Sequence, residues 1–178
     1  MKTKLNQSLK LAIASAIVAG SMGLSATSSA ATATSNMAVS TTVATACTIS
    51  AGALSFGSYD PTASANNDAT ATISSTCTSG GAAKITMSEG ANKLDGSSTS
   101  VPKRAMKTTG EGSQTLAYHL YRDSDRTSVW GNTDATGEGV TGTGSAVTTT
   151  VYGAITKSQT VSAGTFTDTV AVTITYWC

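Results

Sequence analysis

The sequence predicts an all-β fold, an antiparallel sandwich of short strands. Three observations predict it. Several segments alternate apolar and polar residues with a period of two, whereas no stretch after residue 31 keeps apolar residues at helical spacing for three turns. Ser and Thr make up about a third of the chain, far above ordinary usage, and Thr and Val favour strands. Clusters of Gly, Asn, Asp and Ser separate the alternating segments, as turns do.

The composition excludes several functional classes. The chain has 178 residues with 11 Lys and Arg against 10 Asp and Glu, a formal charge of +1. That balance disfavours a nucleic-acid partner, which needs clustered cations. With three Cys and one His, there is little material for a metal site or a histidine-based catalytic centre. No base–nucleophile pair is visible, so we expect no enzyme, no catalytic residue and no cofactor.

The first 31 residues have the three parts of a secretory signal peptide. Lys2, Lys4 and Lys10 form a positive head, residues 11–24 an apolar run, and small residues at 28–31 offer cleavage after Ala30 or Ala31. The run is shorter than the ~20 residues of a spanning helix. We therefore expect export across the inner membrane to an oxidising compartment, with no membrane span in the mature chain.

Residues 32–46 form an N-terminal extension ahead of the first cysteine. A lead rich in Ala, Thr and Ser is followed by an alternating segment, 37–43. A strand there would place Met37, Val39, Thr41 and Val43 on one face. This extension predicts a strand that precedes the main domain, residues 47–178.

Six further strands are predicted in that domain. Their residue ranges are 54–59, 69–78, 83–88, 115–121, 146–155 and 166–176, with loops at 64–68, 90–100 and 131–144. The last strand alternates cleanly, with Val170, Val172, Ile174 and Tyr176 on one side. An immunoglobulin-like sandwich needs about seven strands, so this one is predicted to lack its last.

A missing edge strand would expose backbone donors and acceptors together with a slot in the apolar core. Residues 37–43 are a spare strand that another copy of the chain can supply. The alternative is that these residues pair within their own chain as an ordinary first strand.

Several motifs along the domain resemble one family. They are LSFGSYDP at 54–61, ISSTC at 73–77, YHLYRDSDRTSVWGN at 118–132, VYGAI at 151–155, Gln159, GTFTD at 164–168 and the ending at 172–176. In this order they are similar to the spore coat protein U family, which includes pilins of archaic chaperone–usher pili. The resemblance implies a structural pilin with an incomplete immunoglobulin-like fold, which polymerises head to tail for adhesion and biofilm formation.

The resemblance also implies partners and site residues. A periplasmic chaperone would hold each subunit, an outer-membrane usher would assemble the surface pilus, and each N-terminal strand would complete the next pilin subunit. Met37, Val39, Thr41 and Val43 would be the donor side chains. Val170, Val172, Ile174 and Tyr176 would flank the acceptor groove and meet the chaperone.

Three cysteines permit three disulfide pairings, and the resemblance selects Cys47 with Cys77. Trp177 and Cys178 extend beyond the point where the family's chains tend to end. Cys178 is therefore expected as an unpaired thiol or an intermolecular bridge.

Two other functions stay open: a tip adhesin acting as a binding module, and a secreted spore-coat structural protein. Other tempting residues have ordinary interpretations. His119 is expected at the surface or packed, Asp123 and Asp125 in a charged turn beside two arginines, and the GEGVTG run at 137–142 in a loop rather than a dinucleotide site.

Overall fold

The computed structural model describes residues 29–108 and 112–177. The chain divides into two units, Met1–Ser40 and Thr41–Cys178. Residues 1–28 of the expected signal peptide and the Cys178 thiol lie outside the described residues. The described residues contain no helix long and apolar enough to cross a membrane.

Residues 29–46 are described and form no strand. The side chains of Met37 and Val39 are each 87% exposed, and that of Val43 is 76% exposed. The alternating segment 37–43 is thus not a strand, and its apolar side chains are exposed.

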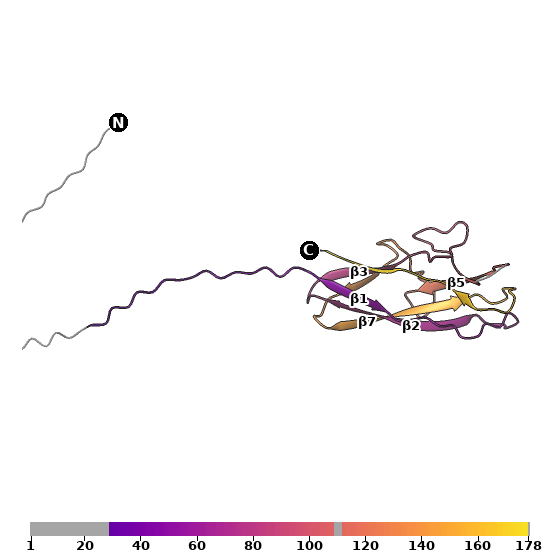
Figure 1. The fold of residues 1–178 in the computed structure, drawn as a ribbon, viewed down its shortest axis with the longest axis horizontal. Coiled ribbons are helices and arrows are strands. Elements are labelled where there is room, and N and C mark those ends of the chain that lie inside the picture. Colours follow the sequence, from indigo (N-terminus) through magenta and orange to yellow (C-terminus); the bar gives the residue numbers. More distant parts are fainter. Residues whose placement is uncertain (1–28, 109–111, 178) are drawn as a thin grey trace, which may run out of the picture. The chain divides into compact units, whose positions relative to one another are not determined.

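The domain is all-β, as predicted, and its strands form two antiparallel sheets (Figure 1). The larger sheet has the order β1-β2-β7-β5-β4-β8, and the smaller has β6-β3-β9. The strands are β1 Cys47–Ala51, β2 Asn67–Cys77, β3 Ala82–Met87, β4 Arg104–Thr108, β5 Thr115–Tyr121, β6 Glu138–Thr141, β7 Ala146–Ile155, β8 Phe166–Thr167 and β9 Val172–Tyr176.

The strand count and some positions differ from the prediction. The first strand is β1 at Cys47–Ala51, not 54–59, because the ladder with β2 ends where the Gly52 amide donates to the Thr72 carbonyl at 2.8 Å. Strand β4 was missed, since its charged residues hide the alternation. Strand β6 lies inside a segment predicted as loop.

The predicted final strand, 166–176, is divided into β8 and β9, which belong to different sheets. The chain crosses between the sheets at residues 168–171. Asp168 fixes this crossing, because its Oδ1 accepts hydrogen bonds from the amides of Ala91 and Asn92 at 3.0 and 3.1 Å. Backbone bonds from the Ala91 amide to the Thr169 carbonyl at 3.0 Å and from the Ser88 amide to the Ala171 carbonyl at 2.9 Å hold the same crossing.

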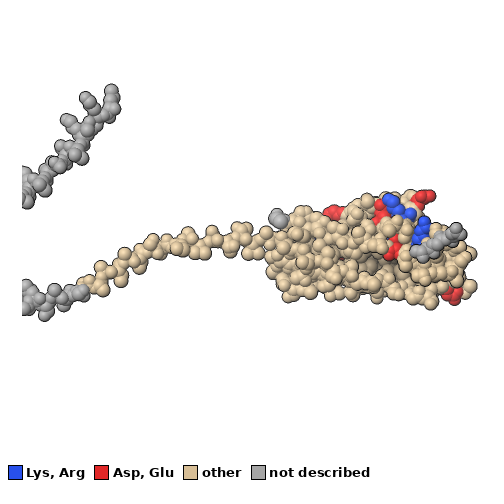
Figure 2. Space-filling view, in the orientation of Figure 1, with Lys and Arg blue, Asp and Glu red and all other residues tan. Residues whose placement is uncertain are grey.

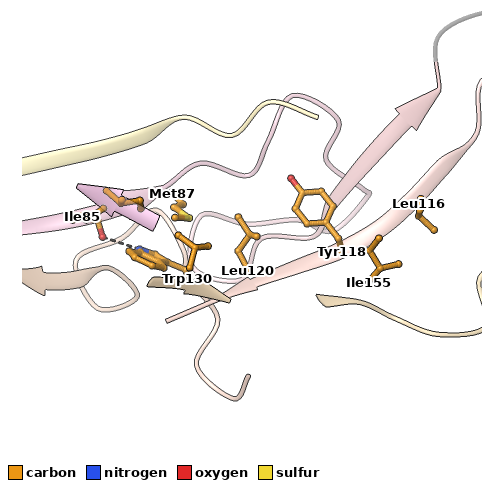
Figure 3. Packing of buried hydrophobic residues seen from close by; sticks show 9 residues of the cluster. Ile85, Met87, Leu116, Tyr118, Leu120, Trp130 and Ile155 are labelled. Carbon is orange, nitrogen blue, oxygen red and sulfur yellow. Dashed lines mark hydrogen bonds between the residues drawn. The ribbon is translucent and has the colours of Figure 1, made fainter. Parts of the chain in front are cut away.

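The core lies between the sheets and is closed most fully around Trp130, which has 0% exposure (Figure 3). The Trp130 Nε1 donates to the Ile85 carbonyl at 3.0 Å, so the buried indole leaves no polar atom unsatisfied. Met87, Leu120 and Ile155 are other members of the same buried cluster.

Cys47 and Cys77 form a disulfide, as the resemblance implied. The two residues lie directly opposite each other in the β1–β2 ladder. The bond therefore fixes the start of β1 to the end of β2.

Candidate functional site

An open groove of about 300 Å³ runs along the domain between two walls. Leu54 and Phe56, which follow β1, form one wall, and Val170 and Val172, at the entry to β9, form the other. The floor consists of core side chains from both sheets: Ile73, Met87, Met106, Tyr118, Leu120 and Val151. The groove is therefore a place where the sandwich core reaches solvent.

A second hollow of about 620 Å³ continues the groove. The two share Leu54, Phe56, Met106 and Phe166, and the second extends beside residues 161–165. The two hollows together form one largely apolar groove along the open side of the domain.

The groove lies where each sheet has an edge. Strand β1 ends the order of the larger sheet and pairs with β2, while β9 ends the order of the smaller sheet and pairs with β3. The two edge strands also contact each other. Each has a second edge that can accept a new ladder.

One polar pair is built into the apolar groove. The Tyr118 hydroxyl donates to Asp168 Oδ2 at 2.7 Å, and both residues line the groove. Burial raises the pKa of Tyr118, and the bond to Asp168 raises it further. The phenol therefore stays a hydrogen-bond donor at neutral pH and holds the carboxylate at the wall.

Arg104 of β4 hydrogen-bonds to backbone carbonyls near the end of β3 and at Trp130. Its guanidinium is fully buried and donates to the carbonyls of Ser88 at 2.8 Å, Met87 at 3.2 Å and Trp130 at 2.8 Å. Burial lowers the pKa of Arg104 to about 10, so the side chain remains a cation at neutral pH. These bonds join β4 of one sheet to the end of β3 in the other.

The structure places the residues predicted for the final strand in two settings. Val170 and Val172 line the groove, and Ile174 packs against the core farther along β9. Tyr176 is 39% exposed. The predicted donor residues Met37, Val39 and Val43 are exposed, as described above, and Thr41 is exposed as well.

Sequence reasoning missed the roles of the opposite wall and of the glycine beneath it. Gly153 lies on β7, and a Cβ there would come within 2.8 Å of Leu54 Cδ2 and Phe56 Cζ. Phe56 in turn meets Tyr118 edge to face at 6.0 Å. A lone Gly inside an alternating strand is a known sign of close approach and could have pointed to this wall.

The other tempting residues have structural roles. His119 lies half-buried on the outward side of β5, and burial lowers its pKa. Asp123 closes a turn by accepting from the amides of Thr127 and Ser128, and the Thr127 hydroxyl bond is the main cause that lowers its pKa to about 2. The GEGVTG run forms β6, with Gly137 before it and Gly142 after it, rather than a loop.

Comparisons with known proteins bear on the family and the fold. A family model for the Spore Coat Protein U domain matches residues 33–173. Protein U of Myxococcus xanthus is 37% identical over 177 residues, which cover 94% of this chain and 98% of that protein.

Among solved structures, the fold is similar to a chain in the CsuC–CsuE chaperone–tip adhesion subunit pre-assembly complex from the archaic chaperone-usher Csu pili of Acinetobacter baumannii. The TM-score is 0.51 at 22% identity, over 75% of this chain and 40% of that chain. This chain thus spans less than half of that chain's length, and the likeness is one of fold.

Proposed function

The chain belongs to the Spore Coat Protein U domain family, and from that premise we propose that it is a structural pilin subunit that polymerises by donor-strand complementation. One observation carries the proposal. An open apolar groove lies between two sheet edges, and the same chain has an alternating segment whose apolar side chains are exposed. The groove lacks a strand to cover its apolar floor, and the segment lacks a place to bury its apolar side chains.

The donor side chains match the groove in kind. Met37, Val39 and Val43 are apolar and lie two and four residues apart, so a strand would direct them to one face. Burying two large side chains and the smaller ones contributes roughly 5–8 kcal/mol before the cost of ordering the segment. New backbone bonds along β1 and β9 add to this.

The direction of insertion decides whether the polymer is open. Strand β9 ends, and β1 begins, at the disulfide end of the domain. A donor antiparallel to β9 ends at the opposite end of the groove, and the three residues between Val43 and Cys47 then span at most about 11 Å. The next domain therefore begins beyond that end, which gives an open head-to-tail chain. A parallel donor would bring two disulfide ends together and permit a closed pair, so we propose the antiparallel direction.

The proposal implies a route and partners. A free subunit with an open apolar groove is prone to aggregate, so a periplasmic chaperone would cover the groove until an outer-membrane usher exchanges it for the donor strand. The final location would be a surface pilus that serves adhesion and biofilm formation.

Deleting residues 32–45 tests the proposal most directly. We expect the truncated protein to form no fibres, while a synthetic peptide of residues 32–46 binds it and raises its stability. Fibres formed by the truncated protein would contradict the donor assignment.

A matched pair of substitutions tests which face of segment 37–43 enters the groove. Val39→Asp would bury a carboxylate in the groove, which costs several kcal/mol, whereas Ser40→Asp adds the same charge on the opposite face. We expect fibre yield to fall by about a hundredfold for the first variant only, a loss of roughly 2.7 kcal/mol. Equal yields would show that the segment does not insert in this register.

A second candidate function is favoured by the match to Protein U, which extends over nearly the full length of both chains. In that case the chain would be a secreted structural protein of a spore coat. Immunolabelling distinguishes the two, because a pilin is found on surface fibres of growing cells and a coat protein on spores.

A further inference from the structure

One outward face of the larger sheet carries hydroxyl side chains instead of charges. It is formed by strands β1, β2 and β7, whose outward residues alternate with the buried ones. We call it the hydroxyl face, and its members are Thr48, Ser50, Thr70, Thr72, Ser74, Thr76, Thr148 and Thr150. Thr76 and Thr150 are half-buried, and the others are exposed.

The ladder register arranges these hydroxyls in rows across the strands. Ser50 lies opposite Ser74, which lies opposite Thr148. Thr72 faces Thr150 in the neighbouring row. Rows repeat about every 6.7 Å along a strand and neighbours lie about 4.8 Å apart across it, so the face is a regular array of small polar groups.

The charged residues are gathered elsewhere. Among the outward positions of the three strands, Asp68 at the start of β2 is the one that is charged. Figure 2 shows tan atoms over the part of the domain that begins at β1, with the Lys, Arg, Asp and Glu side chains toward the other end. The charges at its border are paired with each other, Arg122 with Glu138 at 3.7 Å beside Thr148 and Thr150, and Arg126 with Asp68 at 3.2 Å.

We propose that the hydroxyl face is a surface for side-by-side association of the fibres, and that its partner is the same face of a second copy. The inference rests on the proposed polymer. A hydroxyl both donates and accepts hydrogen bonds, so an array of hydroxyls is complementary to itself. The lack of charge removes the repulsion that two identical faces would otherwise have.

The size of the face explains why the polymer is needed. Three strands by about seven residues cover roughly 15 by 23 Å, so two facing copies bury on the order of 700 Å². That is below the roughly 1,200 Å² of a stable specific interface, so single subunits do not pair. Fibres present the face once per subunit, and multivalent contact strengthens weak pairing by roughly 10²–10⁴-fold.

The donor groove leaves this surface free. Donor insertion uses the inward side chains and the open edges of β1 and β9, while the hydroxyls point away from the core. Assembly along the fibre and association between fibres are thus separate events that different substitutions affect.

Thr72→Lys tests the proposal, with Thr99→Lys as its matched control. Thr72 is exposed in the middle of the hydroxyl face, and Thr99 is exposed in the loop between β3 and β4, where it lines neither the groove nor the hollow beside Thr148 and Thr150. Both variants change the net charge equally. In fibres assembled from the full-length chain at low salt, we expect bundling of wild type and Thr99→Lys, and about tenfold less low-speed sedimentation of Thr72→Lys.

Two further experiments distinguish charge repulsion between fibres from structural damage caused by the substitution. High salt, at which screening acts within about 3 Å, is expected to restore bundling of Thr72→Lys fibres. Mixing them with Thr72→Glu fibres is expected to restore it at low salt, because opposite charges then meet. Fibres of Thr72→Lys that bundle like wild type, or failure of the mixture to bundle, would overturn the inference. Absence of any wild-type fibre would overturn the proposed function instead.

Discussion

The core around Trp130 and the groove beside β9 use the same kinds of side chain, but one is closed and the other is open. Around Trp130, the indole and the Arg104 guanidinium donate to carbonyls of their own chain and are wholly buried. In the groove, Leu54, Phe56, Val170 and Val172 remain partly exposed. Because the closed region fixes the spacing of the two sheets, the open region keeps its shape without an inserted strand.

The largest expected effect comes from the closed region. Trp130→Ala removes the central buried side chain, and we expect the free energy of unfolding to fall by roughly 3–5 kcal/mol. The loss should be the same in free subunit and in fibre, because no donor residue touches this site under the proposal. Urea unfolding of both forms measures it, and a loss confined to the fibre would contradict the comparison.

Removing the disulfide is expected to come next. Cys47 and Cys77 are separated by 30 residues, and closing such a loop stabilises a fold by about 3.6 kcal/mol in the chain-entropy model. The double variant Cys47→Ser/Cys77→Ser should lose about that much when unfolded by urea. Reduction of the wild-type protein should match it, whereas a much smaller loss would show that β1 holds without the covalent bond.

Tyr118→Phe affects the boundary between the closed core and the open groove, because Tyr118 belongs to the buried cluster and also lines the groove. It removes the bond to Asp168, and a hydrogen bond to a charged group is worth about 1.5–3 kcal/mol. Tyr152→Phe is the control, since that hydroxyl makes no hydrogen bond within the described part of the chain. We expect destabilisation and slower fibre assembly for the first variant only.

The same tyrosine predicts a pH dependence. Its pKa is raised above the ordinary value of 10.0 in the folded chain. As pH rises through about 10, the unfolded chain releases this proton while the folded chain keeps it. Stability should therefore be unaffected below that pH and fall above it, and Tyr118→Phe should lose less stability on the same alkaline titration.

The smallest effect is expected in the groove itself. Val172→Ala removes groove surface that is half-exposed in the free subunit, so the free subunit should lose little. In the fibre the same methyl groups would be buried, at about 0.8 kcal/mol per CH₂, so roughly 1 kcal/mol more should be lost there. Equal losses in both forms would show that the groove stays empty.

The sequence was sufficient for the fold class because the alternation in β2, β5 and β7 is strong, with mostly apolar residues inside and, in β2 and β7, mostly hydroxyl residues outside. It was insufficient where pairing depends on distant partners. Arg104 begins a strand because its side chain reaches carbonyls across the core, and no local pattern reveals that. Asp168 divides a segment whose alternation predicts one strand, by accepting hydrogen bonds from Ala91 and Asn92. These partners are far away in sequence, so the local pattern does not reveal the division.

The groove was anticipated only in part. Val170 and Val172 were expected to flank it, because the family resemblance implied an acceptor groove beside the final strand. Leu54 and Phe56 appeared only as elements of a motif, because their wall is not a regular strand. The position of this wall depends on Gly153 of β7, because a side chain there would collide with Leu54 and Phe56.

The position of the disulfide has a mechanical consequence. In the proposed polymer, tension pulling on a fibre enters each domain at Cys47, where the N-terminal extension joins β1. Without a covalent link, that tension would unzip β1 from its neighbour one hydrogen bond at a time. The bridge to Cys77 passes it instead to β2, which is held on both sides by β1 and β7, so the ladder must shear as a whole rather than peel.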